Sequence, residues 1–95
     1  MNDLEILKTI GLIRESFDDS VKVFTEGSCV KFCMILQHLY PDGSILYDMN
    51  HAIFQYGHNC FDINGYTTKT LNHIPLEAYG LLKSYEIMNL KYNKL

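Results

Sequence analysis

The chain has 95 residues, which is enough for one domain and short for two. It is 47% hydrophobic and 20% charged, a balance typical of a globular protein rather than a disordered one. The net charge of −3 and the scattered lysines argue against direct nucleic-acid binding, which needs clustered Lys and Arg to neutralise phosphates.

Residues 3–17 carry apolar side chains at helical spacing and predict an N-terminal helix with a broad apolar face. Asp3 and Glu5 lie in its first turn, where negative charge suits the helix dipole. Residues 18–20 indicate a break. The stretch from Val21 to Phe24 fits either a further helical turn or a short strand.

A central helix is predicted from about Cys29 to Tyr40. Ser28 suits the N-cap position before it, where a hydroxyl can accept a hydrogen bond from a free backbone amide. Apolar residues cover most of the helix circumference, which indicates that the helix is largely buried. The Pro-Asp-Gly sequence at 41–43 ends it and turns the chain.

Three strands rich in Ile, Phe and Tyr follow, and we interpret them as a three-stranded antiparallel meander. They run over Ser44–Asp48, His51–Tyr56 and Asn59–Asn64. Gly65 ends the meander, residues 66–73 are expected to form a loop, and Pro75 is well placed to open a C-terminal helix. The predicted fold is therefore α+β, as a single domain over residues 1–95.

The hairpin register divides these strands into two faces. A two-residue turn at Gly57-His58, with Gly57 at positive φ, pairs apolar residues on one face, which suits packing on a helix. The pairs are Tyr56 with Asn59, Phe54 with Phe61, and Ala52 with Ile63. The opposite face holds His51 across from Asn64 and diagonal to Asp62, both within reach of a side-chain hydrogen bond. A longer loop would change this pairing.

The three cysteines, Cys29, Cys33 and Cys60, do not suggest a disulfide framework, because their number is odd and the acidic N-terminus is unlike a signal peptide. Cys29 and Cys33 could join histidines in a metal site, but closed zinc sites usually bring tighter spacing. We expect neither a metal nor a cofactor. No stretch approaches the roughly 18 apolar residues of a membrane span, so a cytoplasmic protein is expected.

Cys29 is the first candidate for chemistry, although cysteines are often inert, buried small hydrophobes. As the first residue of a helix, it would lie among unpaired backbone amides at the positive end of the dipole, which favours a thiolate. The same amides could hold an oxyanion during acyl transfer.

His51 is the candidate general base, although a histidine at a strand end is most simply a surface residue. Asp62 or Asn64 could fix its tautomer and orientation, the third role in a nucleophile–base–orienter set. Asn64 and Asp62 could instead be turn formers, an interpretation that suits Asn64 better. His58 and His73 are interpreted as exposed turn and loop residues.

The segments Gly27–Phe32, Tyr40–Gly43, Asn50–Phe54 and Phe61–Gly65 together resemble small phage and bacterial proteins. The shared pattern is Gly-x-Cys on a helix, a Pro-centred turn, a strand with His, and a Tyr/Phe-Asp-x-x-Gly strand. This order is similar to the core of papain-like folds of the NlpC and transglutaminase-like type. In those folds Cys opens a helix, and His and a polar residue lie on successive strands.

The resemblance implies a minimal papain-like cysteine hydrolase or acyl-transfer domain that acts on an amide or a thioester. Cys29 would be the nucleophile, His51 the base and Asp62 the orienter, with Asn64 as a competing orienter. The expected substrate is a protein or a peptide, and the expected location is the host cytoplasm if the protein is phage-encoded.

Two alternatives stand beside the enzyme. The short interval between Cys29 and His51 leaves no room for a substrate-binding subdomain, which favours a catalytically silent phage-type protein that binds and inhibits a host defence protein. A net negative surface would suit a basic partner. The plainer alternative is a small homodimeric domain whose exposed tyrosines form the interface.

Overall fold

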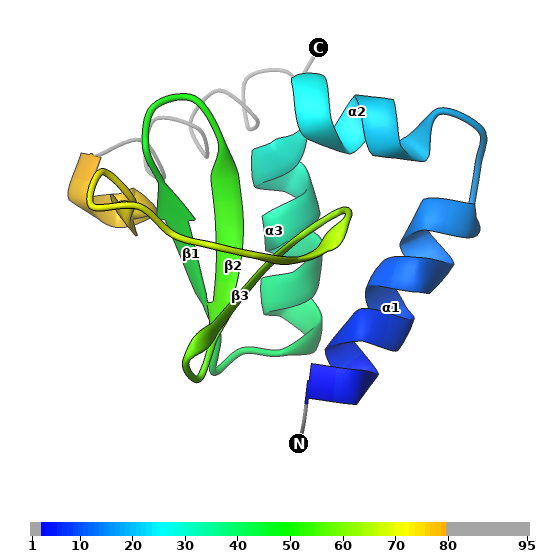
Figure 1. The fold of residues 1–95 in the computed structure, drawn as a ribbon, viewed down its shortest axis with the longest axis horizontal. Helices are drawn as coiled ribbons and strands as arrows, with labels where there is room; N and C mark the ends of the chain where they lie inside the picture. The colour runs from blue at the N-terminus through cyan, green and yellow to red at the C-terminus, as the bar shows by residue number, and fades with distance from the viewer. Residues whose placement is uncertain (1–2, 80–95) are drawn as a thin grey trace, which may run out of the picture.

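The structure is a computed structural model that describes residues 3–79 (Figure 1). Its helices and strands, in chain order, are α1 (Asp3–Glu15), α2 (Ser20–Glu26), α3 (Cys29–Leu39), β1 (Ser44–Tyr47), β2 (Ala52–Tyr56), β3 (Asn59–Asp62), β4 (Gly65–Thr67), β5 (Ile74–Pro75) and the 3-10 helix η1 (Leu76–Tyr79). Helices gathered before a sheet make this an α+β fold, as the sequence predicts.

The ambiguous stretch after α1 is helical. Within α2, Ser20 is buried and Phe24, four residues later, packs against the core, whereas Val21 and Val23 are exposed. A strand would also have placed Ser20 and Phe24 on one face and Val21 and Val23 on the other. The pattern of apolar residues in the sequence therefore fits a helix and a strand equally well. The buried Ser20 hydroxyl donates to the Arg14 carbonyl and ties α2 to the end of α1.

The sheet is antiparallel throughout, with strand order β4-β3-β2-β1-β5. The predicted hairpin register is confirmed where β2 meets β3: Tyr56 pairs with Asn59 and Phe54 with Phe61. Gly57 in the connecting turn has a φ of 63°, the left-handed conformation that the two-residue turn requires.

One face of the sheet is covered by helices, and the main core lies between them. In Figure 1, α3 lies against the sheet and the β3–β4 hairpin extends toward α1, in agreement with the contacts of α3 with β1, β2 and β3 and of α1 with β4. The largest fully buried side chains of this core are Ile6, Ile10, Phe32, Leu36, Phe54, Phe61 and Ile63. The face predicted to pack on a helix, with Phe54 and Phe61, is therefore the face that does so.

The opposite face of the sheet holds a smaller buried cluster of Leu46, Ile53 and Cys60. The backbone at Lys69 approaches the Cys60 thiol and contributes a hydrogen bond to it. The chain after β4 thus runs back over this face of the sheet.

The predicted three-stranded meander is incomplete, because two further strands flank it. Gly65, predicted to end the sheet, begins β4 at a φ of 108°, which a glycine adopts without strain, and the chain turns back along β3. Pro75, predicted to open a helix, lies in β5, an edge strand where its missing N–H is tolerated. The rest of the predicted C-terminal helix, after residue 79, lies outside the described residues.

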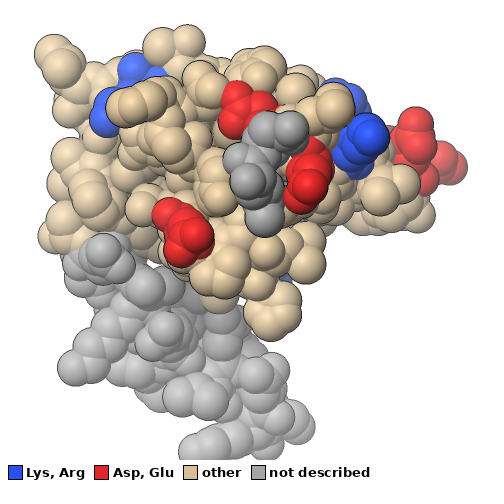
Figure 2. All heavy atoms as spheres, turned by 90° about the horizontal axis from the view of Figure 1, so that it is seen from below, with Lys and Arg blue, Asp and Glu red and all other residues tan. Residues whose placement is uncertain are grey.

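Acidic and basic side chains are spread thinly over the face seen from below in Figure 2, where small groups of each sign are separated by uncharged surface. Within residues 3–79, no helix has the length and the apolar character needed to cross a membrane.

The turn between α3 and β1 allows a direct test of core packing. A Cβ built on Gly43 would lie 2.0 Å from the Phe54 ring, so Gly43→Ala must displace a fully buried aromatic residue. We expect a loss of about 1–3 kcal/mol in the free energy of unfolding, measured by urea denaturation. The matched control is Gly11→Ala in α1, where a built Cβ meets nothing within 4 Å apart from the helix's own backbone. This substitution should raise the free energy of unfolding by roughly 0.5–1 kcal/mol, because alanine favours a helix more than glycine does. Equal effects of the two substitutions would contradict this packing.

Candidate functional site

Cys29 lies where the first turn of α3 meets the start of β2. It is the first residue of the helix, as the sequence predicts, and its side chain is half-buried. The backbone N–H of Ala52 donates to the Cys29 sulfur, with 3.4 Å between the two atoms. Ser28 occupies the N-cap position, but its hydroxyl makes no capping hydrogen bond, so it does not engage the first-turn amides of α3.

His51 ends the turn between β1 and β2 and directly precedes Ala52. Its ring nitrogen Nε2 lies 3.5 Å from Oδ2 of Asp62, at the end of β3, and the two side chains are 29% and 16% exposed. The N–H that contacts the Cys29 sulfur belongs to the peptide bond between His51 and Ala52. The structure therefore brings His51 and Asp62 together, and it places the Cys29 sulfur against the backbone amide that follows His51.

The His51 ring is oriented by its contact with Asp62. Nε2 faces Asp62, so Nδ1 is the ring nitrogen that this carboxylate does not engage. A carboxylate at Nε2 favours the tautomer that carries its proton there, which leaves an acceptor lone pair on Nδ1. Asp62 is thus the carboxylate that lies next to the His51 ring.

Asn64 contributes to this region through its backbone. It is exposed in the β3–β4 turn, and its N–H donates to Asp62 Oδ1 at 2.8 Å. This bond leaves Asp62 Oδ2 facing His51. Asn64, which the sequence suggests as a competing orienter, therefore contacts Asp62 through its backbone.

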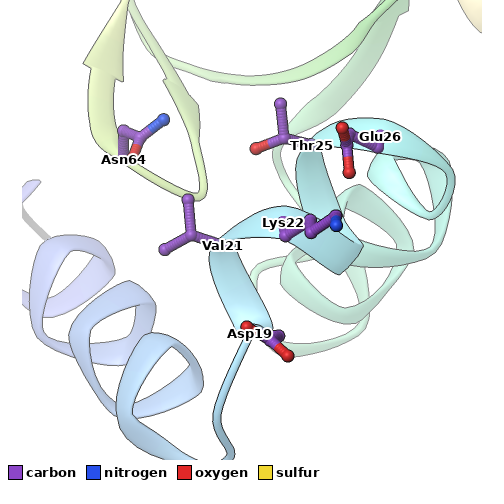
Figure 3. A pocket seen from close by; sticks show the side chains of 6 residues that line it. All are labelled: Asp19, Val21, Lys22, Thr25, Glu26 and Asn64. Carbon is purple, nitrogen blue, oxygen red and sulfur yellow. The ribbon is translucent and has the colours of Figure 1, made fainter.

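A shallow hollow lies between α2 and the β3–β4 turn, beside the site. Figure 3 shows Asn64 on the hairpin opposite Val21 and Lys22 of α2. Its remaining lining residues are Asp19, Thr25 and Glu26, and a neighbouring hollow extends along α2 to Gly27 and Ser28, directly before Cys29. Cys29, His51 and Asp62 are not among the residues that line these two hollows.

The other two thiols are in different surroundings. Burial in the core raises the pKa of the Cys33 thiol far above its ordinary value, and the nearby Cys29 and Asp62 raise it further. Burial also raises the pKa of Cys60, on the opposite face of the sheet. A buried thiol held in its protonated form is a poor nucleophile, so Cys29 is the cysteine whose position suits chemistry.

His73 is the residue that sequence reasoning assigned wrongly. It was predicted to be an exposed loop residue, but its side chain is only 6% exposed and its Nε2 lies 3.6 Å from Asp48 Oδ2. The pairing of Tyr47 with Ile74 between β1 and β5 places His73 next to Asp48. The run Ile74-Pro75 was too short to show this strand, whereas His58 is exposed in its turn, as predicted.

Within the described part of the chain, residues 3–79, no group of three or more His, Cys, Asp and Glu side chains is arranged to hold a metal ion.

The structure defines a small α+β domain in which Cys29 opens a helix and His51 faces Asp62. Residues 6–94 match the family described as Phage YunG-like protein, and the chain belongs to this family. The match confirms the predicted resemblance to phage proteins. Comparison with curated proteins found no match, and comparison with solved structures found none either.

Asp48 gives a prediction about pH. It accepts hydrogen bonds from the backbone N–H groups of His51 and Asn50, which hold the pKa of its carboxyl below its ordinary value. The ionised carboxylate therefore stabilises the fold above the ordinary Asp pKa of about 3.9, and this contribution is lost as the pH falls below it. Asp48→Asn should cost on the order of 1 kcal/mol of unfolding free energy at pH 7, and this deficit should shrink toward pH 3.

The measurement is urea denaturation of wild type and Asp48→Asn across this pH range. Asp18→Asn, which neutralises an exposed carboxylate before α2, is the control and should change stability little at either pH. A deficit for Asp48→Asn that is independent of pH would contradict the role of the charge.

Proposed function

We propose that this protein is a cysteine hydrolase or acyl-transfer domain with a minimal papain-like arrangement of Cys29, His51 and Asp62. The observation that carries the proposal is the position of the Cys29 sulfur, which accepts a hydrogen bond from the amide directly after His51 while the His51 ring faces Asp62. A nucleophile beside a base, with the base oriented by a third group, is the arrangement that covalent catalysis uses.

In the proposed reaction, His51 Nδ1 takes the thiol proton of Cys29 as the sulfur attacks the carbonyl carbon of an amide or a thioester. The carbonyl oxygen becomes an oxyanion, and the protonated His51 then gives its proton to the departing amine or thiol. The product is a thioester between the acyl group and Cys29. Water attacks this thioester, His51 accepts a proton from the water, and the acid is released as the thiol is re-formed with that proton.

The first turn of α3 supplies the group that would stabilise the oxyanion. Backbone N–H groups at a helix start have no partner within the helix and lie at the positive end of its dipole. Because the Ser28 hydroxyl does not cap this turn, the amides next to Cys29 are not engaged by that side chain. Donors positioned where negative charge develops are often the largest single contribution to catalysis.

The proposed substrate is a protein or a peptide, reached from the surface beside α2. His51 is 29% exposed, so a carbonyl could approach the site from the side of the shallow hollow that ends at Ser28. The family is one of phage proteins, which favours a substrate in the host cytoplasm.

The test is acyl transfer from a peptide thioester, followed by mass spectrometry of the acylated protein. We expect wild type to carry the acyl group on Cys29 and to release it by hydrolysis. Cys29→Ala should abolish acylation, and His51→Ala should lower kcat/KM by at least about 100-fold, because general base catalysis typically contributes at least this much. Asp62→Asn should lower it by a smaller factor, of order tenfold.

Cys60→Ala is the matched control, since Cys60 is a buried thiol whose pKa is raised by burial, and its removal should not affect the reaction. Acylation at Cys33 or Cys60, or an unchanged rate in His51→Ala, would reject the proposal.

A second candidate function is that of a catalytically silent protein that binds and inhibits a host defence protein. The observation that favours it is the exposure of apolar side chains on and between α1 and α2, where Leu12 is 69% and Phe17 45% exposed. Exposed apolar patches are typical of sites that bind another protein or a second copy of the same chain.

Protection of a phage from a host defence system, measured as plaque number, separates the two functions. Inhibition by binding predicts that Leu12→Asp loses the protection and Cys29→Ala keeps it. The enzymatic function predicts the reverse, with Cys29→Ala inactive.

A further inference from the structure

We propose that His73 is a positioning residue for His51 and that it acts through the Asp48 carboxylate. This role deepens the proposed function and rests on it, because the orientation of His51 affects a reaction only if His51 is the base. The inference starts from three observations: a buried histidine next to a carboxylate, a strained turn, and a hydrogen bond that joins this turn to His51.

The tautomer of neutral His73 follows from its contacts. Its Nδ1 accepts a hydrogen bond from the backbone N–H of Thr70 at 3.1 Å, and the Thr70 hydroxyl lies at the same distance. A backbone N–H can only donate, so Nδ1 carries no proton and the proton of the neutral ring lies on Nε2. The loop from Thr70 to His73 therefore directs an N–H toward Asp48.

Nε2 of His73 is fully enclosed and lies 3.6 Å from Asp48 Oδ2, slightly longer than a hydrogen bond. Burying a polar N–H without a partner is unfavourable, so the ring has a strong preference for any shift that closes this gap. The pairing of β5 with β1 holds the two residues opposite one another. The structure therefore holds the buried His73 ring against the Asp48 carboxylate.

Asp48 transmits this contact to His51 through its other oxygen. Oδ1 accepts from the N–H of Asn50 at 2.9 Å and from that of His51 at 2.8 Å. Met49, between Asp48 and Asn50 in the chain, has a φ of 77°, in the left-handed region. A non-glycine residue in this region costs on the order of 1–3 kcal/mol and persists only where its surroundings impose it.

The Asp48 side chain is therefore what fixes the backbone from which the His51 ring projects toward Asp62. Outer residues that orient a functional histidine in this way typically change affinity or activity by about 10–100-fold when they are removed. His73 limits the freedom of the Asp48 carboxylate from one side, and the two amides limit it from the other.

The test uses a matched pair of substitutions at His73. In His73→Gln the side-chain amide can still donate to Asp48 from a position like that of Nε2. In His73→Asn the shorter side chain can accept from Thr70, as Nδ1 does, but cannot reach Asp48 in the same way. Both variants remove the imidazole, so a difference between them reports on the donor to Asp48.

Two readouts are taken on each variant: kcat and KM for the peptide thioester, and the NMR resonances of the His51 backbone amide and ring. We expect His73→Asn to lower kcat about tenfold with little change in KM, and to shift the His51 resonances. His73→Gln should stay within about threefold of wild type in kcat and leave those resonances near their wild-type positions. Equal losses in the two variants, or unmoved His51 resonances in His73→Asn, would overturn the proposal.

The NMR readout keeps this result separate from the proposed function. If wild type transfers no acyl group but the His51 resonances still respond as described, the positioning contact stands and the enzymatic function fails. If His73→Asn does not fold, Thr70→Gly provides the second variant, since it removes the hydroxyl from Nδ1 and leaves the backbone donor in place. It should shift the His51 resonances in the same direction by a smaller amount, and no shift would count against the proposal.

Discussion

The amide of Ala52 donates to the Cys29 sulfur over 3.4 Å, and this contact joins the first residue of α3 to the first residue of β2. It can form only because α3 packs along the sheet over β2, with Phe32 and Leu36 of the helix and Phe54 of the strand in one buried core. The burial of these large side chains is what holds the helix start against the strand start. The position of Cys29 thus depends on the register between α3 and β2, and a shift of either element would separate the thiol from the start of β2.

Two turns complete the site, and a carboxylate stabilises each of them. Asp48 accepts from backbone amides in the β1–β2 turn, and Asp62 accepts from the Asn64 amide in the β3–β4 turn. Each carboxylate presents its second oxygen to a histidine, Asp48 to His73 and Asp62 to His51. The same acidic residues therefore shape the local backbone and set the surroundings of the imidazoles. This double use lets two carboxylates organise both the turns and the imidazoles of a short chain.

The sequence predicted the parts of the fold that depend on local patterns. Helical spacing located α1 and α3, and the turn at Gly57-His58 set the register that put His51 diagonal to Asp62, because hairpin geometry is determined by a few neighbouring residues. The edge strands could not be predicted in the same way. β5 is two residues long and forms only because it pairs with β1. The paired residues Tyr47 and Ile74 are 27 positions apart in the chain, and their pairing also buries His73. The link between Cys29 and β2 is likewise a tertiary contact, which order along the chain suggested but spacing alone could not establish.

The proposed function requires the Cys29 thiol and the His51 ring to lie close together, and cross-linking with dibromoacetone tests this requirement most directly. The reagent first alkylates a reactive thiol, and its second carbon then bonds only to a nucleophile within the reach of a three-carbon bridge. The account predicts a bridge between the Cys29 sulfur and the His51 ring, identified by mass spectrometry of the joined peptides, and only single alkylation of Cys29 in His51→Ala. A wild-type protein whose Cys29 is alkylated but bridges to another residue, or to none, would contradict it.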